Sequence, residues 1–157
     1  MSIDDLLSGE KLILIAEKEN KSNLFKILEL LTGMTDFLSV LLILLPLYPQ
    51  PMDGYVYSVN LWLYMETATY NRTVYWILFL ALTAGGAWEI FQTQLDIRRG
   101  RNLVAVVTNI VSVLTVLYLI MAREAYAATV AVLLLVMKGL LYLRIARLTG
   151  EKERWHN

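Results

Sequence analysis

The chain has 157 residues, 57% of them hydrophobic, and its 14 basic and 14 acidic side chains leave no net charge. This hydrophobic share exceeds the roughly 45–50% of an ordinary soluble domain, so the composition favours a membrane protein. The absence of cysteine excludes disulfides and thiolate metal sites, and a single histidine, His156, leaves no ligand set for a catalytic zinc ion. The sequence also contains no phosphate-binding glycine loop and no nucleophile motif. We therefore expect no enzyme activity, no cofactor and no bound metal.

The first segment, residues 1–26, is charged and is expected to lie in the cytoplasm as short helices. Ser2 is a suitable N-cap for the first helix, and Gly9 is a suitable stop. A second helix is expected to begin near Glu10, with a break near residues 20–23.

Four apolar stretches follow this segment. A helix needs about 20 mostly apolar residues to cross the hydrocarbon core of a bilayer. Leu103–Met121 meets this length without a charged residue. The other expected spans, about residues 27–47, 73–91 and 126–143, carry the charged residues Asp36, Glu89 and Lys138 respectively. The predicted fold is an all-α membrane protein, with a four-helix bundle at residues 27–148 and a charged tail at residues 149–157. Three spans with a re-entrant segment are the alternative.

The basic residues predict how this bundle is oriented. If the N-terminus lies in the cytoplasm, only Arg72 and Arg123 fall on the outer side. The basic residues on the inner side are then Lys11, Lys18, Lys21, Lys26, Arg98, Arg99, Arg101, Arg144, Arg147, Lys152 and Arg154. Because Lys and Arg accumulate in cytoplasmic loops, both termini are expected inside. The chain is therefore expected to be a multi-pass membrane protein, with the lipid bilayer as its main partner.

The longest connection, residues 48–72, is rich in aromatic residues and is expected on the outer face. Tyr and Trp favour the headgroup layer because each joins an apolar ring to a polar tip. An interfacial belt and a surface that binds an amphipathic ligand both fit this composition. The candidate ligand surface comprises Tyr55, Tyr57, Trp62 and Tyr64.

Two charged residues are expected at membrane depth. Asp36 lies roughly 13 Å along the first span, and Lys138 lies roughly 8 Å from the cytoplasmic end of the last one. A lysine side chain can cover most of that difference, so an intramembrane ion pair is one interpretation. The other is a Lys that extends to the headgroups and an Asp beside a neighbouring threonine. Glu29 and Glu89 are expected to be solvated near the cytoplasmic boundary.

Small and hydroxyl side chains predict where the helices approach closely. Ala81, Gly85 and Gly86 allow close packing of the second span, either within the bundle or between two copies in a homodimer. Thr108, Ser112 and Thr115 share one face of the third span, which favours hydrogen bonding between helices.

The N-terminal residues carry a resemblance to a known family. Ser2-Ile3-Asp4-Asp5-Leu6-Leu7-Ser8-Gly9-Glu10 is similar to the closing motif of XRE-family helix-turn-helix domains. Four further segments resemble the C-terminal membrane region of certain Firmicutes regulators: Lys11–Asn23, Leu45–Pro49, Asp53–Leu61 and Asn71–Trp76.

The resemblance implies a membrane anchor and sensor domain, joined in full-length relatives to an upstream DNA-binding domain. The recognition helix would precede Ser2, so the resemblance implies no direct nucleic-acid contact by this chain. The alternative functions are a stand-alone small membrane protein that acts as a partner subunit and a transporter of a small molecule or ion.

Overall fold

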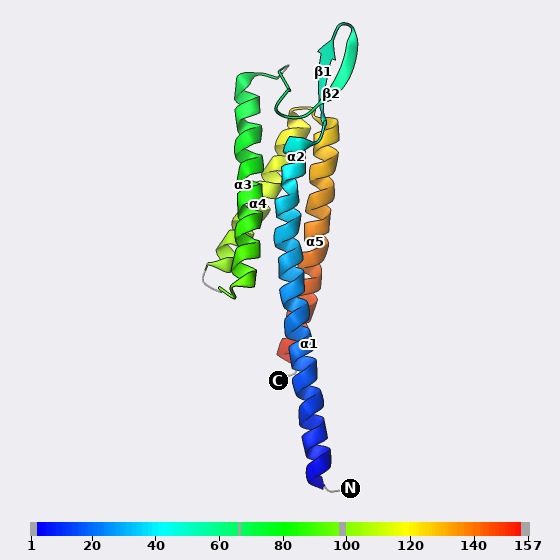
Figure 1. The fold of residues 1–157 in the computed structure, drawn as a ribbon, viewed down its shortest axis with the longest axis vertical. Coiled ribbons are helices and arrows are strands. Elements are labelled where there is room, and N and C mark those ends of the chain that lie inside the picture. The colour runs from blue at the N-terminus through cyan, green and yellow to red at the C-terminus, as the bar shows by residue number, and fades with distance from the viewer. Residues whose placement is uncertain (1–2, 66, 98–99, 155–157) are drawn as a thin grey trace.

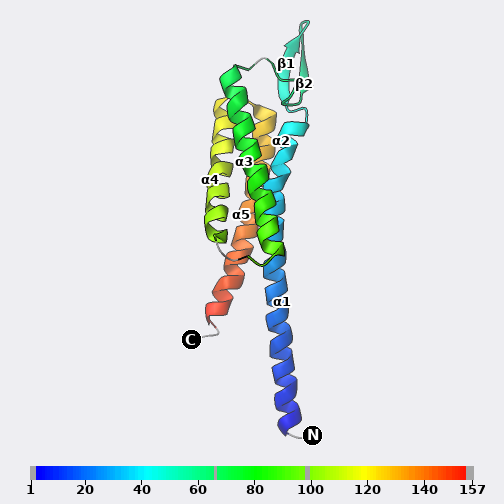
Figure 2. The same cartoon turned by 60° about the vertical axis from the view of Figure 1, so that its left-hand side comes forward.

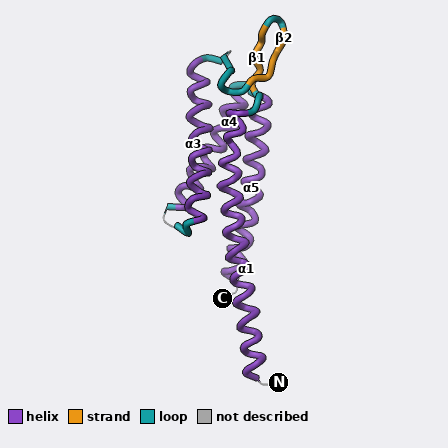
Figure 3. The backbone as a smooth tube through the Cα atoms, viewed as in Figure 1, coloured by secondary structure: helices purple, strands orange, loops and turns teal. Residues whose placement is uncertain are grey.

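The computed structural model describes residues 3–65, 67–97 and 100–154, and side chains are described for residues 8–65, 67–97 and 100–150. It is helical except for one two-stranded hairpin (Figure 3). The predicted positions Ser2, Arg98, Arg99 and His156 lie outside the described residues.

The first helix, α1, runs without interruption over Ile3–Phe37. It passes through Gly9 and residues 20–23, where the sequence predicts helix ends, so that prediction is wrong. One glycine inside a helix costs about 1 kcal/mol, and the flanking helix-forming residues outweigh this cost. A short 3-10 turn at Leu38–Val40 and the helix α2, Leu41–Leu44, extend the same rod. The rod ends at Leu45, whose backbone is extended as expected for a residue that precedes a proline.

The hairpin pairs β1, Tyr48–Met52, with β2, Tyr55–Val59, in antiparallel register. Asp53 and Gly54 form its two-residue turn, and both have positive φ angles. This is the conformation that Asp-Gly favours in tight hairpins. The hairpin projects beyond the helices at the end of the molecule opposite both termini (Figure 1).

Three long helices complete the molecule: α3, Thr69–Gln94; α4, Arg101–Met121; and α5, Ala125–Arg154. They pack with the C-terminal half of α1, whereas the N-terminal half of α1 extends past the bundle (Figures 1 and 2). Four segments of the described chain are long and apolar enough to cross a membrane, namely Ser8–Leu44, Thr69–Gln94, Arg101–Met121 and Ala125–Gly150. The predicted number of apolar helices is therefore confirmed.

The interior of the bundle changes character along its length. The half next to the hairpin is an apolar and aromatic core that includes Tyr48, Tyr75, Phe79 and Leu119. The half nearer the termini instead buries polar and charged side chains, described below. The outward faces of the helices remain apolar: large aliphatic side chains such as Val106, Ile110 and Leu117 are exposed along α4.

A candidate functional site: a buried polar network across four helices

An ion pair joins the first and last helices inside the bundle. The Nζ atom of Lys138 on α5 donates to Oδ2 of Asp36 on α1 over 2.6 Å. Lys138 is 1% exposed and Asp36 is 4% exposed, so both charges are shielded from bulk solvent. A buried charge is tolerated only where a partner compensates for its lost hydration. The sequence leaves two interpretations open, an ion pair and a lysine that extends to the headgroups. The geometry in the structure is that of the ion pair.

The same ammonium group reaches the other two helices through a hydroxyl. Lys138 Nζ also donates to Oγ1 of Thr108 on α4, at 3.1 Å. The Thr108 hydroxyl in turn donates to Oε1 of Glu89 on α3, at 2.7 Å. We call these four side chains, Asp36, Lys138, Thr108 and Glu89, the buried network. Each helix of the bundle supplies one of them, so the network connects all four.

The helix sequences explain why these side chains face inward. On α3 the buried positions recur every three or four residues, at Tyr75, Phe79, Leu82, Gly86, Glu89 and Gln92. This is the spacing of one helix face, and Glu89 continues the stripe. On α4 the inward stripe contains the hydroxyl residues Thr108, Ser112 and Thr115. The predicted shared face of these three residues is therefore confirmed, and it points into the bundle.

The sequence interpretation misplaced two acidic residues, Glu29 and Glu89. The side chain of Glu29 is 14% exposed and pairs with Arg101, so the prediction that it is solvated is wrong. Glu89 is 6% exposed, so the prediction that it is solvated at the boundary is wrong. The missed signal was its position three residues after Gly86, on the face that packs against α1. A Cβ atom built on Gly33 of α1 would lie 3.1 Å from the Cβ of Glu89, so the two helices touch at this level.

Two further ion pairs lie toward the end of the molecule that holds the termini. Arg101 Nη1 and Glu29 Oε2 are 2.9 Å apart and link α4 to α1. Lys26 Nζ and Asp96 Oδ2 are 3.9 Å apart, and both side chains are about half exposed. An exposed pair of this kind contributes little to stability, commonly about 0–1 kcal/mol.

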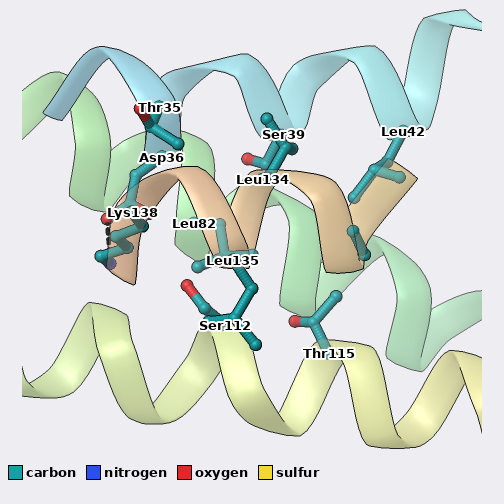
Figure 4. Close-up of a pocket in the computed structure, with 11 residues that line it drawn as sticks. Thr35, Asp36, Ser39, Leu42, Leu82, Ser112, Thr115, Leu134, Leu135 and Lys138 are labelled. Carbon is teal, nitrogen blue, oxygen red and sulfur yellow. Dashed lines mark hydrogen bonds and ion pairs between the residues drawn. The ribbon is translucent and has the colours of Figure 1, made fainter. Parts of the chain in front are cut away.

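A small cavity lies beside the ion pair (Figure 4). Asp36 and Lys138 line one end, and the hydroxyls of Ser39, Ser112 and Thr115 line the rest, together with aliphatic side chains. Its volume is about 20 Å³, which is enough for one water molecule. Ser112 and Thr115 donate to carbonyl groups of their own helix, so their oxygen lone pairs remain available as acceptors.

A second polar centre lies under the hairpin. Glu124 is 3% exposed, and its Oε1 accepts hydrogen bonds from Tyr64 at 2.6 Å and from Tyr75 at 3.4 Å. Tyr48 stacks on Tyr64 and donates to the carbonyl of Leu42 at 2.8 Å. Burial raises the pKa of the Tyr48 hydroxyl well above its ordinary value, so Tyr48 remains a hydrogen-bond donor. These contacts fasten the outer connection to the helices.

The structure separates the predicted aromatic ligand surface into two parts. Tyr55, Tyr57 and Trp62 are exposed, whereas Tyr64 is buried against Glu124. Tyr64 therefore has a structural contact and does not share a surface with the other three. Trp62 packs edge-on against Trp76 of α3, with ring centroids 5.1 Å apart.

The small residues of α3 occupy different environments. A Cβ atom on Gly86 would collide with the backbone nitrogen of Phe37 and approach the carbonyl of Gly33 to 2.7 Å. A Cβ atom on Gly85 would lie 2.6 Å from Cγ2 of Thr108. Both glycines thus allow close packing within the bundle, while Ala81 is exposed on its outside.

The arrangement of these groups is suited to holding charges and protons inside an apolar bundle. Among the residues with described side chains, no group of three or more His, Cys, Asp or Glu residues is placed to hold a metal ion. The fold and the buried network define a protein of four apolar helices that are connected inside the bundle by an ion pair and a hydroxyl group. Comparison with known proteins places such a chain among bacterial transcriptional regulators.

The chain is 39% identical over 144 residues to the HTH-type transcriptional activator BcrR of Enterococcus faecalis. The match covers 92% of this chain and 71% of that protein, so the chain belongs to the family of this activator. The predicted bacterial origin, the Firmicutes affinity and the role in transcriptional regulation are supported by this relationship. No protein-family model and no solved structure matches the chain.

This relationship corrects the assignment drawn from the N-terminal motif. The chain matches most of a protein that is named as an activator in its own right, so its assignment as the C-terminal membrane fragment of an XRE-family regulator is wrong. The implied function as an anchor and sensor domain is wrong for the same reason, and neither the partner-subunit nor the transporter alternative gains support. A motif of nine residues is too short to define a family.

Proposed function

We propose that this chain activates transcription in a bacterium while it is inserted in the cytoplasmic membrane. The observation that carries the proposal is its 39% identity to a transcriptional activator over 92% of its own length. The membrane location is supported by four helical segments of 21 residues or more with apolar outward faces. A bilayer core of about 30 Å requires about 20 such residues in a helix.

The distribution of charge supports one orientation in the membrane. Both termini lie at one end of the bundle, and the hairpin lies at the other (Figure 1). Basic side chains gather toward the end with the termini, including Lys18 and Lys26 on α1, Arg101 on α4 and Arg147 on α5. By the positive-inside rule this end faces the cytoplasm. The N-terminal half of α1 then lies in the compartment that contains the DNA and the transcription machinery.

The orientation can be tested with cysteine labelling, because the natural chain contains no cysteine. Ser22 lies on the exposed half of α1 and Ser58 lies on β2, and both are exposed, so S22C and S58C are matched isosteric variants. A membrane-impermeant maleimide should label S58C in intact cells and S22C only after permeabilisation. Labelling of S22C in intact cells would contradict the proposed orientation.

Transcription is tested separately, by deleting the gene and sequencing the cellular RNA. A restricted set of transcripts should decrease in the deletion strain and recover when the wild-type gene is returned. An unchanged transcript profile would contradict the activator function. If regulation requires the membrane, a copy that carries Ile110→Lys, a charge on the outward face of α4, should not restore these transcripts. Recovery of the transcripts with that variant would contradict the requirement for the membrane but not the activator function.

A further inference from the structure

The buried network contains more acidic groups than basic ones. Two of its members, Asp36 and Glu89, are carboxylic acids, and one member, Lys138, is a cation. Within the described side chains, no other Lys or Arg nitrogen lies within 4 Å of either carboxyl group. If both acids were ionised, the interior of the bundle would carry an uncompensated negative charge, which is strongly unfavourable away from water.

The neighbouring ionisable groups do not remove this excess. Glu29 of α1 faces the network and adds another acid, but Arg101 of α4 lies 2.9 Å from it and compensates it. Tyr142 of α5 also faces the acids of the network, and a tyrosine hydroxyl is neutral or negative, never positive. The excess charge must therefore be neutralised at Asp36 or at Glu89.

The hydrogen bonds distinguish between these two acids. Asp36 receives the ammonium of Lys138 directly, at 2.6 Å, which stabilises its ionised form. Among the described side chains, the one that donates to Glu89 is the neutral hydroxyl of Thr108, at 2.7 Å. A protonated Glu89 can still accept this hydrogen bond at Oε1 while Oε2 carries the proton.

We propose that the buried network is a binding site for one proton, and that Glu89 holds this proton when the bundle is folded. The ion pair of Asp36 and Lys138 is then neutral, and Glu89 is a neutral acid joined to it through Thr108. This inference depends on the packing of the four helices and does not depend on the proposed role in transcription.

The test is infrared spectroscopy of the full chain in micelles of dodecyl maltoside, a detergent without ester carbonyl groups that would absorb where a protonated carboxylic acid does. A protonated carboxylic acid has a carbonyl band that is separate from the bands of carboxylates, and its position shifts in heavy water. At neutral pH the wild type should show this band, and E89Q should lose it. E29Q is the matched control, because it changes a Glu of the same cytoplasmic half that has its own arginine, and it should keep the band.

Several outcomes would overturn the proposal. The wild type could lack the acid band at neutral pH, or the band could persist in E89Q and vanish in D36N. A missing band together with stabilisation by added Na⁺ would identify a metal cation in place of the proton.

A second measurement covers the case in which E89Q does not fold. Thr108→Val removes the hydroxyl that donates to Glu89 but keeps the shape of the side chain, and it should shift the position of the acid band. An unchanged band in folded T108V would assign the proton to another group.

Discussion

Lys138 is the residue on which the polar interior of the bundle depends. Its ammonium group donates to the carboxylate of Asp36 and to the hydroxyl of Thr108, and its side chain is 1% exposed. The contribution of such a pair to the free energy of unfolding depends on whether both partners are replaced or only one is removed. A buried pair contributes little relative to two apolar residues, but removal of one partner leaves the other as an uncompensated charge.

At this scale we predict a non-additive result for the two charged residues. D36N and K138M should each lower the free energy of unfolding by about 3–5 kcal/mol, because each leaves a buried charge without its partner. The exchange variant D36K/K138D should lower it by less than either single substitution. Unfolding of the purified protein in mixed micelles measures all three values. Equal losses in the three variants would show that the pair does not act as a unit.

At the scale of the helices, α1 and α3 approach each other closely. This contact depends on Gly33 and Gly86, where the backbone of one helix lies directly against the other. Without a side chain at these positions, Asp36 on α1 and Glu89 on α3 can reach the same layer of the bundle. The glycines therefore set the helix separation on which the buried network relies.

We predict that Gly86→Ala is destabilising and that Gly139→Ala is not. A Cβ atom at residue 86 would collide with the backbone of α1, whereas one at residue 139 meets no atom within 4 Å. Overpacking of this kind typically costs about 1–3 kcal/mol. Because both changes replace a helical glycine with alanine, the difference in thermal midpoint between them isolates the contact with α1. A similar midpoint for the two variants would contradict the close crossing.

The sequence is informative about helices and less so about their interiors. Hydropathy alone predicts four apolar helices, because a long run without charge admits few alternatives. The depth of Lys138 and Asp36 suggests their pairing, but the inclusion of Glu89 depends on the rotation of α3, which adjacent helices determine. The aromatic residues around Asp53-Gly54 favour an assignment to the membrane interface, so the hairpin is not predicted although this pair is a strong turn signal. The separation of Tyr64 from Tyr55 depends on Glu124, which lies 60 residues away in the chain.

At the scale of the whole molecule, exposed apolar side chains have two different environments. Those on the bundle, such as Ile110, face outward from helices long enough to cross a bilayer, whereas those on the N-terminal half of α1, such as Leu12, lie beyond the bundle. In the proposed orientation the first group contacts lipid and the second lies in the cytoplasm. The two groups of side chains are similarly exposed. A different effect of a lysine substitution in the two groups would therefore show that one is surrounded by lipid and the other by water.

We predict that Ile110→Lys impairs membrane insertion and that Leu12→Lys does not. The two side chains are 55% and 67% exposed, and both changes replace an aliphatic residue with the same cation. A lysine at the centre of a membrane helix costs about 2.5–3.5 kcal/mol of insertion free energy, and a lysine in water costs nothing comparable. Carbonate extraction of cell membranes, followed by immunoblotting, measures the inserted fraction. Equal insertion of the two variants would indicate that α4 is not surrounded by lipid.

The uninterrupted length of α1 has a mechanical consequence. Asp36 and Ser8 belong to one helix without a proline, and they are about 42 Å apart along its axis at a rise of 1.5 Å per residue. The continuous hydrogen-bonded ladder makes such a rod stiff against twisting. A small rotation of α1 that moved Asp36 away from Lys138 would therefore turn the distant end of the rod by a similar angle. Under such a rotation, a change around one buried lysine would change the direction that the exposed end of α1 faces.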